Sequence, residues 1–113
     1  MSYYENPQGV SVHDGFPNPA SDIALQALDL NQLLIRHPIS TFFMRVAGNN
    51  GEQHGVFEGD IIIVDRALKP RTTHLVIYWQ DDSMMVCRFA YLPPGAQVWG
   101  VVSSIIHQLV QKP

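Results

Sequence analysis

The sequence has a single cysteine, few charged residues and no long apolar run. Cys87 alone cannot form an intramolecular disulfide or build a thiolate metal cage, which fits a reducing, cytoplasmic location. Charged residues make up only 15% of the 113 residues, unlike the composition of disordered charged tails. No apolar stretch approaches the roughly 20 residues of a membrane span, and the polar first residues do not follow the pattern of an export signal. We expect a globular, cytoplasmic protein that does not contact a membrane.

Acidic residues outnumber basic ones by ten to seven, which gives a formal charge of −3. Sequence-independent affinity for nucleic acid comes mainly from Lys and Arg that displace counterions, so direct nucleic-acid binding is not expected. The five histidines show neither the i, i+4 pairing on a helix nor the cysteine spacing of a zinc site: His13, His37, His54, His74 and His107. The sequence therefore predicts no metal and no cofactor.

The chain is predicted to consist of an arm followed by one domain. Residues 1–21 contain three prolines and two glycines among scattered polar residues, which disfavours both helix and sheet. We interpret them as an extended N-terminal arm, followed by a domain over residues 22–113. The segment 23–30 fits the helical and the strand period equally well, so its structure stays open.

A short helix is expected at the front of the domain. Asn31 can cap a helix that begins at residue 32, and Pro38 stops it. Three leucines follow the spacing of one buried stripe: Leu30, Leu33 and Leu34. One or two helical turns are predicted.

From residue 40 onward the apolar period changes to two. Residues 40–46 are predicted to form a strand with Phe42 and Met44 on one face and Phe43 on the other. Further β-branched, apolar segments bounded by turns lie at residues 61–64, 74–79, 84–89, 98–102 and 105–110. Residues 80–83 read as a hairpin turn. The pattern indicates a mainly β fold, a small curled sheet or partly closed barrel with one or two short helices.

A turn is expected immediately before the second strand. In the sequence Glu58-Gly59-Asp60, the glycine is suited to a positive φ, and the Asp60 carboxylate can bond nearby backbone amides.

Five segments occur in an order that is typical of one family: 14–20 (DGFPNPA), 28–38 (LDLNQLLIRHP), 43–48 (FMRVAG), 59–65 (GDIIIVD) and 99–102 (WGVV). From about Gly15 to the C-terminus, the chain resembles the UmuD branch of the LexA-like, S24 self-cleaving peptidases. The run from Asp29 to Pro38 is the most specific part, because it is similar to UmuD rather than to LexA or a phage repressor. The resemblance implies the LexA-like C-terminal fold for residues 22–113.

The resemblance also locates a catalytic dyad that this chain lacks. Members of the family cleave themselves with a serine in a Ser-Gly-Asp-Ser-Met loop, activated by a lysine that burial keeps neutral. Asn50 stands at the serine position and Cys87 at the lysine position. The neighbouring Arg88 cannot act as the base because it stays protonated. The resemblance thus implies a degenerate peptidase with no catalytic residues.

The bond that the family cleaves is also altered. Relatives have a small residue before a glycine ahead of a Phe-Pro-x-Pro run, and the matching dipeptide here is Asp14-Gly15. An unpaired carboxylate buried in an apolar cleft would cost several kcal/mol. Between Phe89 and Trp99 the chain is shorter than its relatives, which is expected to expose sheet edges.

The resemblance implies a protein that acts by binding. Its partners would be a second UmuD-like chain, in a homodimer or heterodimer, an error-prone Y-family translesion DNA polymerase of the SOS response, and RecA. The implied contact residues are Phe16, Asp29, Asn31, Gln32, Leu33, Arg36 and His37.

Two alternatives stay open. The chain could be a decoy that forms mixed dimers with active UmuD or LexA-like proteins. It could also be an S24-related hydrolase that uses Cys87, although alternation with Met85 and Phe89 favours a small buried side chain at that position.

Overall fold

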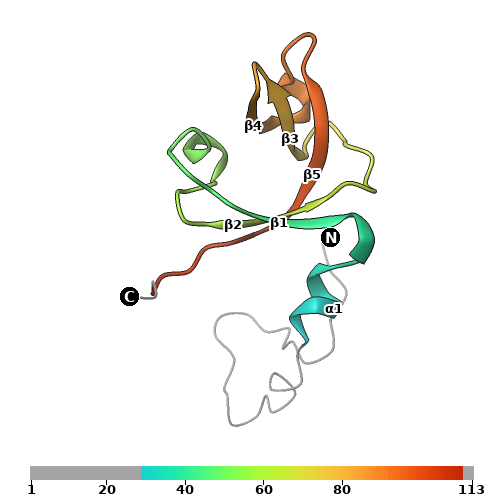
Figure 1. Cartoon of the computed structure of the whole chain (residues 1–113), viewed down its shortest axis with the longest axis vertical. Helices are drawn as coiled ribbons and strands as arrows, with labels where there is room; N and C mark the ends of the chain where they lie inside the picture. The colour runs from blue at the N-terminus through green and yellow to red at the C-terminus, as the bar shows by residue number, and fades with distance from the viewer. Residues whose placement is uncertain (1–28, 111–113) are drawn as a thin grey trace, which may run out of the picture. The chain divides into compact units, whose positions relative to one another are not determined.

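The computed structural model describes residues 29–110 (Figure 1). The chain divides into two units, Met1–Arg36 and His37–Pro113, which are described separately. The predicted arm over residues 1–21 lies outside the described residues. Among the described residues, no helix is long and apolar enough to cross a membrane.

The first unit contains the helix α1, Leu30–Leu34, which confirms the predicted short helix. The predicted cap, Asn31, is wrong. Asp29 is the N-cap, with extended backbone angles and a carboxylate that accepts a hydrogen bond of 2.9 Å from the Asn31 N–H. The helix therefore begins before Asn31, which lies within its first turn. It ends at Ile35, whose backbone is extended.

The second unit is an antiparallel sheet in the order β1-β2-β5-β3-β4. Its strands are β1 (Thr41–Arg45), β2 (Ile61–Asp65), β3 (Leu75–Gln80), β4 (Ser83–Arg88) and β5 (Gln97–Ile106). Three short 3-10 helices lie at η2 (Pro38–Ser40), η3 (Glu52–His54) and η4 (Phe89–Tyr91). The sheet is open, because β1 and β4 are its two edges. The expected mainly β fold with short helices is confirmed.

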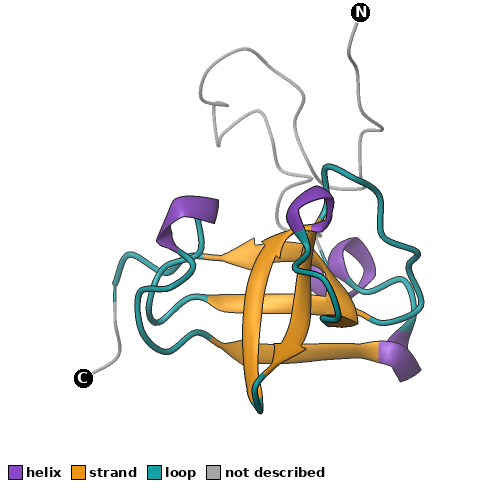
Figure 2. Cartoon of the chain, turned by 90° about the horizontal axis from the view of Figure 1, so that it is seen from above, coloured by secondary structure: helices purple, strands orange, loops and turns teal. Residues whose placement is uncertain are grey.

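The long strand β5 joins the two halves of the sheet. Its C-terminal part pairs with β2 and its N-terminal part pairs with β3, with a register shift in each ladder. Figure 2 shows the two groups of strands crossing each other. The sequence predicted two separate segments, 98–102 and 105–110, but one strand runs through to Ile106. Ser103 does not interrupt it, because its hydroxyl donates to the Ile63 carbonyl at 3.2 Å.

Alternation along β3 gives the sheet a core on each face. On one face, Ile77 belongs to the first core, with Val56, Ile62 and Val64. On the other face, the neighbouring residues Val76 and Tyr78 belong to the second core, with Cys87 and Val101. Burying each such aliphatic side chain stabilises the fold by about 1.5–3 kcal/mol.

The β3–β4 hairpin turns through two residues with positive φ, Asp81 at 52° and Asp82 at 64°. Two consecutive left-handed residues form the turn that matches the twist of a hairpin, and glycine favours the second position. We predict that Asp82→Gly raises the free energy of unfolding by about 1 kcal/mol, measured by urea denaturation. The control, Ser83→Gly in the adjacent strand, should lower it by about 0.5–1 kcal/mol. A destabilised Asp82→Gly protein would contradict the prediction.

Candidate functional site

A pocket of about 240 Å³ opens beside the edge strand β4. Apolar side chains from β1 to β4 and from the loop after β1 form most of its walls: Met44, Val46, Val56, Ile62, Ile77, Met84, Met85 and Val86. Ala47 and Gly51 complete the apolar lining, and only Arg45 and Asn50 contribute polar side chains. Several of these side chains also form or pack against the first core, so the pocket is a recess in that core.

The loop that carries Asn50 is packed tightly against β4. A Cβ atom at Gly51 would lie 3.0 Å from the Cβ of Val56 and 3.2 Å from Cγ1 of Val86. The Gly51 carbonyl also accepts hydrogen bonds from the N–H groups of His54 and Val56. Because glycine is the residue that fits this close approach, the loop holds exposed Asn50 at the pocket.

Cys87 does not line the pocket with Asn50. It pairs across the hairpin with Val76 and lies in the second core, whereas the preceding residue, Val86, faces the pocket. Successive strand residues point to opposite faces of the sheet, so the two predicted dyad positions have their side chains in different places. The structure brings Asn50 together with Val86 rather than with Cys87.

The surroundings of Cys87 keep its thiol protonated. Burial raises the pKa of Cys87, and a hydrogen bond with Tyr78 opposes this shift without cancelling it. Burial also raises the pKa of Tyr78, and Cys87 adds to this effect. A protonated thiol is a poor nucleophile, so this site disfavours covalent chemistry.

The other predicted site residues are distributed over both units. Asp14, Gly15 and Phe16 lie outside the described residues. In the first unit, α1 and the residues next to it contain Asp29, Asn31, Gln32, Leu33 and Arg36, all of them exposed. His37 belongs to the second unit. Among residues 29–110, no group of three or more potential metal ligands lies close together.

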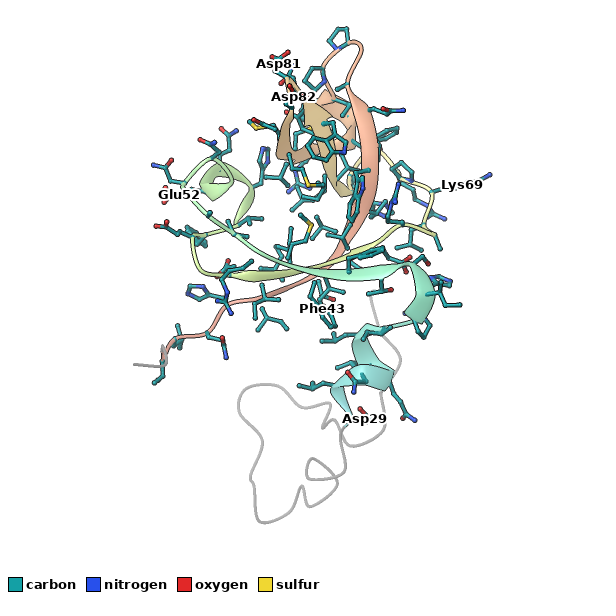
Figure 3. The ribbon with its side chains drawn as sticks, viewed as in Figure 1. Asp29, Phe43, Glu52, Lys69, Asp81 and Asp82 are labelled. Atoms are coloured by element: carbon teal, nitrogen blue, oxygen red, sulfur yellow. The ribbon has the colours of Figure 1, made fainter. Side chains whose placement is uncertain are left out.

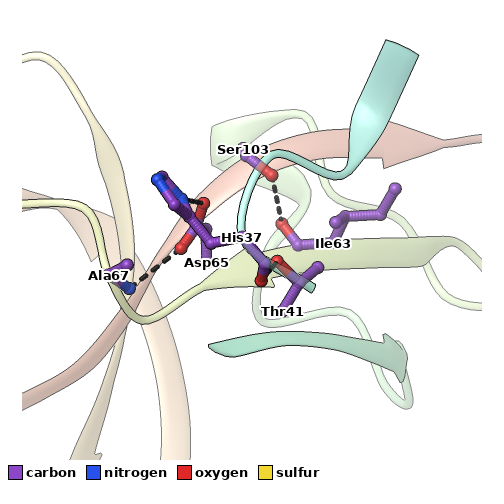
Figure 4. Close-up of polar contacts among 6 residues, drawn as sticks. All are labelled: His37, Thr41, Ile63, Asp65, Ala67 and Ser103. Atoms are coloured by element: carbon purple, nitrogen blue, oxygen red, sulfur yellow. Dashed lines mark hydrogen bonds and ion pairs between the residues drawn. The ribbon is translucent and has the colours of Figure 1, made fainter. Parts of the chain in front are cut away.

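Two buried carboxylates at the ends of β2 are the strongest polar feature of the sheet. Asp65, only 3% exposed, accepts a hydrogen bond of 2.6 Å from Nδ1 of His37 (Figure 4). Asp60, only 1% exposed, accepts one of 2.5 Å from Nδ1 of His107. Both histidine side chains are about half exposed. They tie the segments before β1 and after β5 to the two ends of β2.

Each carboxylate is held in its charged form. For Asp60, burial alone would raise the pKa, but the hydrogen bonds from His107 and the Phe57 N–H and the charge of His107 together place it below the ordinary value of 3.8. Asp65 has a lowered pKa for the same reasons, with His37 and the Ala67 N–H as partners. The predicted turn at Asp60 is confirmed, including a φ of +88° at Gly59.

Sequence reasoning missed both histidine partners. His37 is 28 residues from Asp65, and His107 is 47 residues from Asp60. The sequence does contain a clue, because an aspartate stands at each end of the apolar run 61–64. A carboxylate buried next to such a run needs a hydrogen-bond partner.

Comparison with known proteins identifies the class. Residues 7–99 match the family model described as Peptidase S24-like, and the chain belongs to this family. It is 38% identical to Protein ImpA of Salmonella typhimurium over 112 aligned residues, covering 83% of this chain and 77% of the relative. Protein SamA of Salmonella typhimurium strain LT2 is 36% identical, covering 83% and 79%. Protein MucA of Escherichia coli is 29% identical, covering 88% and 80%. These matches confirm the resemblance to UmuD-like S24 proteins.

The buried carboxylates predict a loss of stability in acid. The pKa values of Asp60 and Asp65 in the folded protein lie below 3.8, so their contribution is complete above that pH and is lost as the pH falls through the folded values. Urea denaturation at pH values from about 7 to about 2.5 should show this decline. In the Asp60→Asn variant, the free energy of unfolding should fall less steeply with pH. An equally steep fall would show that Asp60 does not contribute to the acid sensitivity.

Removing a histidine partner should be costly at neutral pH. We predict that His107→Ala lowers the free energy of unfolding by about 1–3 kcal/mol, because a buried carboxylate loses a hydrogen bond. The control is His54→Ala, which removes only an exposed contact with Gln53 and should change stability by less than about 0.5 kcal/mol. If both substitutions changed the free energy of unfolding equally, the hydrogen bond between His107 and Asp60 would not be stabilising.

Proposed function

We propose that this chain is a UmuD-like protein without peptidase activity, which acts in the cytoplasm by binding in SOS mutagenesis. Its proposed role is that of a dimeric accessory subunit for an error-prone Y-family DNA polymerase. The single observation that carries the proposal is the lining of the pocket, which has the walls of a binding site but no group that can accept a proton.

The chemistry of acyl transfer explains why this lining matters. A hydroxyl or thiol nucleophile needs a base that takes its proton. The pocket offers the amide of Asn50, which is not a base, and the guanidinium of Arg45, which stays protonated and donates to the Gly59 carbonyl. The lack of activity is therefore supported by the pocket itself, whether or not Cys87 occupies the position of the family's lysine.

The same reasoning weakens the alternative of a Cys87 hydrolase. The thiol is buried in the second core, its pKa is raised, and its described polar contact is with Tyr78 rather than with a histidine. A reactive cysteine instead needs a cationic, accessible environment.

Exposed apolar side chains support a role in protein binding. On α1, no residue is buried, and Leu30 is 57% exposed. Leu33 on the same helix is also exposed, and both belong to the segment that most resembles UmuD. In the second unit, Phe43 is 60% exposed on the edge strand β1. Apolar groups on a short helix and at a sheet edge are typical contact points for a partner chain.

The absence of cleavage can be tested by mass spectrometry of the intact protein. The chain should stay uncleaved when incubated with activated RecA filament or at high pH, while an active UmuD-like relative is cleaved under the same conditions. Cleavage of the Asp14-Gly15 bond would refute the proposal. Loss of that cleavage in Asn50→Ala or Cys87→Ala would then identify the residue responsible.

Cys87 should resist alkylation in the folded protein. Treatment with iodoacetamide at neutral pH should leave it unmodified, because the thiol is buried and protonated, and urea should allow full labelling. Rapid labelling of the native protein would revive the hydrolase alternative. The mass of the intact chain reports both states.

Partner binding should depend on α1. In pull-down experiments, Leu33→Asp should reduce capture of the chain by the polymerase, whereas the control Gln53→Asp, which makes the same change in charge on the exposed short helix η3, should not. Analytical ultracentrifugation measures self-association of the same variants. A wild-type chain that neither self-associates nor captures a polymerase would contradict the proposed role.

The decoy alternative has its own discriminating result. Co-expression with an active relative should slow that relative's self-cleavage if mixed dimers form. An unchanged time course without a mixed dimer would dismiss the decoy.

A further inference from the structure

The charges of this chain are segregated along the sequence. Residues 66–113 contain five of the seven Lys and Arg residues but only two of the ten Asp and Glu residues. Between Arg66 and Gln80 there is no acidic residue at all. The formal charge of −3 is therefore the sum of −6 over residues 1–65 and +3 over residues 66–113.

The fold brings the segments that carry three of these cations next to one another. The loop between β2 and β3 carries Lys69 and Arg71, and backbone hydrogen bonds connect this loop to η4, where the Ala90 N–H donates to the Thr72 carbonyl at 3.2 Å. Arg88, at the end of β4, donates from Nη1 to the Thr73 carbonyl at 2.8 Å. We call Lys69, Arg71, Arg88 and Tyr91 the basic face.

No carboxylate neutralises these cations within the part of the chain that the structure describes. The ion pairs found there are the two between histidine and aspartate at the ends of β2. The acidic residue nearest to Lys69 and Arg71 in the sequence, Asp65, is buried and bonded to His37. The next ones, Asp81 and Asp82, lie at the tip of the β3–β4 hairpin. A six-residue strand separates that tip from Arg88, about 17–20 Å away. Figure 3 shows Lys69 well away from both aspartates.

An exposed aromatic ring accompanies the cations. Tyr91 ends η4 directly after the residue that is bonded to the loop, and it is 75% exposed. Binding of an acidic peptide would use the cations but would not need the exposed ring of Tyr91. Single-stranded nucleic acid uses cations for its phosphates and exposed aromatic rings for its bases, and guanidinium groups match the geometry of phosphate.

We propose that the basic face is a binding site for single-stranded nucleic acid, with phosphates at Lys69, Arg71 and Arg88 and a base stacked on Tyr91. This differs from the expectation drawn from the net charge of the whole chain, because the local charge determines the field at a surface. The site shares no residue with the proposed contact for a polymerase, which involves α1 and the edge strand β1.

The test uses fluorescence anisotropy with the full chain and a labelled oligothymidylate at several salt concentrations. Wild-type affinity should rise steeply as salt falls, because bound phosphates release counterions. The double variant Lys69→Glu/Arg71→Glu should bind at least about tenfold more weakly and with a smaller salt slope. The matched control compares the single variants Arg71→Glu and Arg45→Glu. Arg45 lies in the same unit, beside the end of β2 opposite the β2–β3 loop, so its variant makes the same change in charge and should retain most of the affinity.

The aromatic contribution is tested separately. Tyr91→Ala should weaken binding by about tenfold, and Tyr91→Phe should preserve it, because stacking requires the ring and not the hydroxyl. Circular dichroism verifies that each variant is folded.

Three results would overturn the proposal: no binding by the wild type at low salt, equal weakening by Arg45→Glu and Arg71→Glu, or displacement of the oligonucleotide by polyglutamate at equal charge concentration. The last would assign the face to an acidic protein. None of these measurements depends on capture of a polymerase, so the two proposals fail separately.

Discussion

The two buried carboxylates that flank β2 constrain the rest of the sheet. A charged aspartate can be buried at the end of an apolar strand only when hydrogen bonds replace its lost hydration. Here each replacement comes from a backbone amide and from a histidine in a distant segment. The side chains of His37 and His107 thereby fix where the chain enters β1 and where it leaves β5. The strand between the carboxylates can then present Ile62 and Val64 to the first core.

This arrangement explains how the candidate site is built. With β2 fixed, the turn at Asp60 leads the chain from the loop that carries Asn50 into the strand. The loop closes against Val86 through the close approach at Gly51. Cys87, one residue further along β4, is directed into the second core with Tyr78. The same alternation that buries both faces of the sheet therefore separates the two residues that the family resemblance had paired.

Much of the fold could be predicted because its determinants are local. The period-two pattern located the strands, and two polar residues between apolar strands located the hairpin at Asp81 and Asp82. Features that depend on distant partners could not be predicted. No local pattern connects His107 to Asp60, and none shows that β5 continues through Ser103. The cap of α1 was misassigned by two positions, because Asp29 and Asn31 have similar local capping tendencies.

The walls of the pocket belong to the core of the fold, so a member of the family can keep the pocket without keeping an activity. Its walls are made by Val56, Ile62 and Ile77, which are buried core residues required for folding. Selection for stability alone would preserve such walls whether or not the chain is catalytic, because both a cavity and an overfilled position in the core lower the free energy of unfolding. Asn50 and Arg45, by contrast, are exposed, so folding does not require a particular side chain at either position. The chemical identity of the few polar residues at the rim, rather than the persistence of the recess, therefore decides what this member of the family can do.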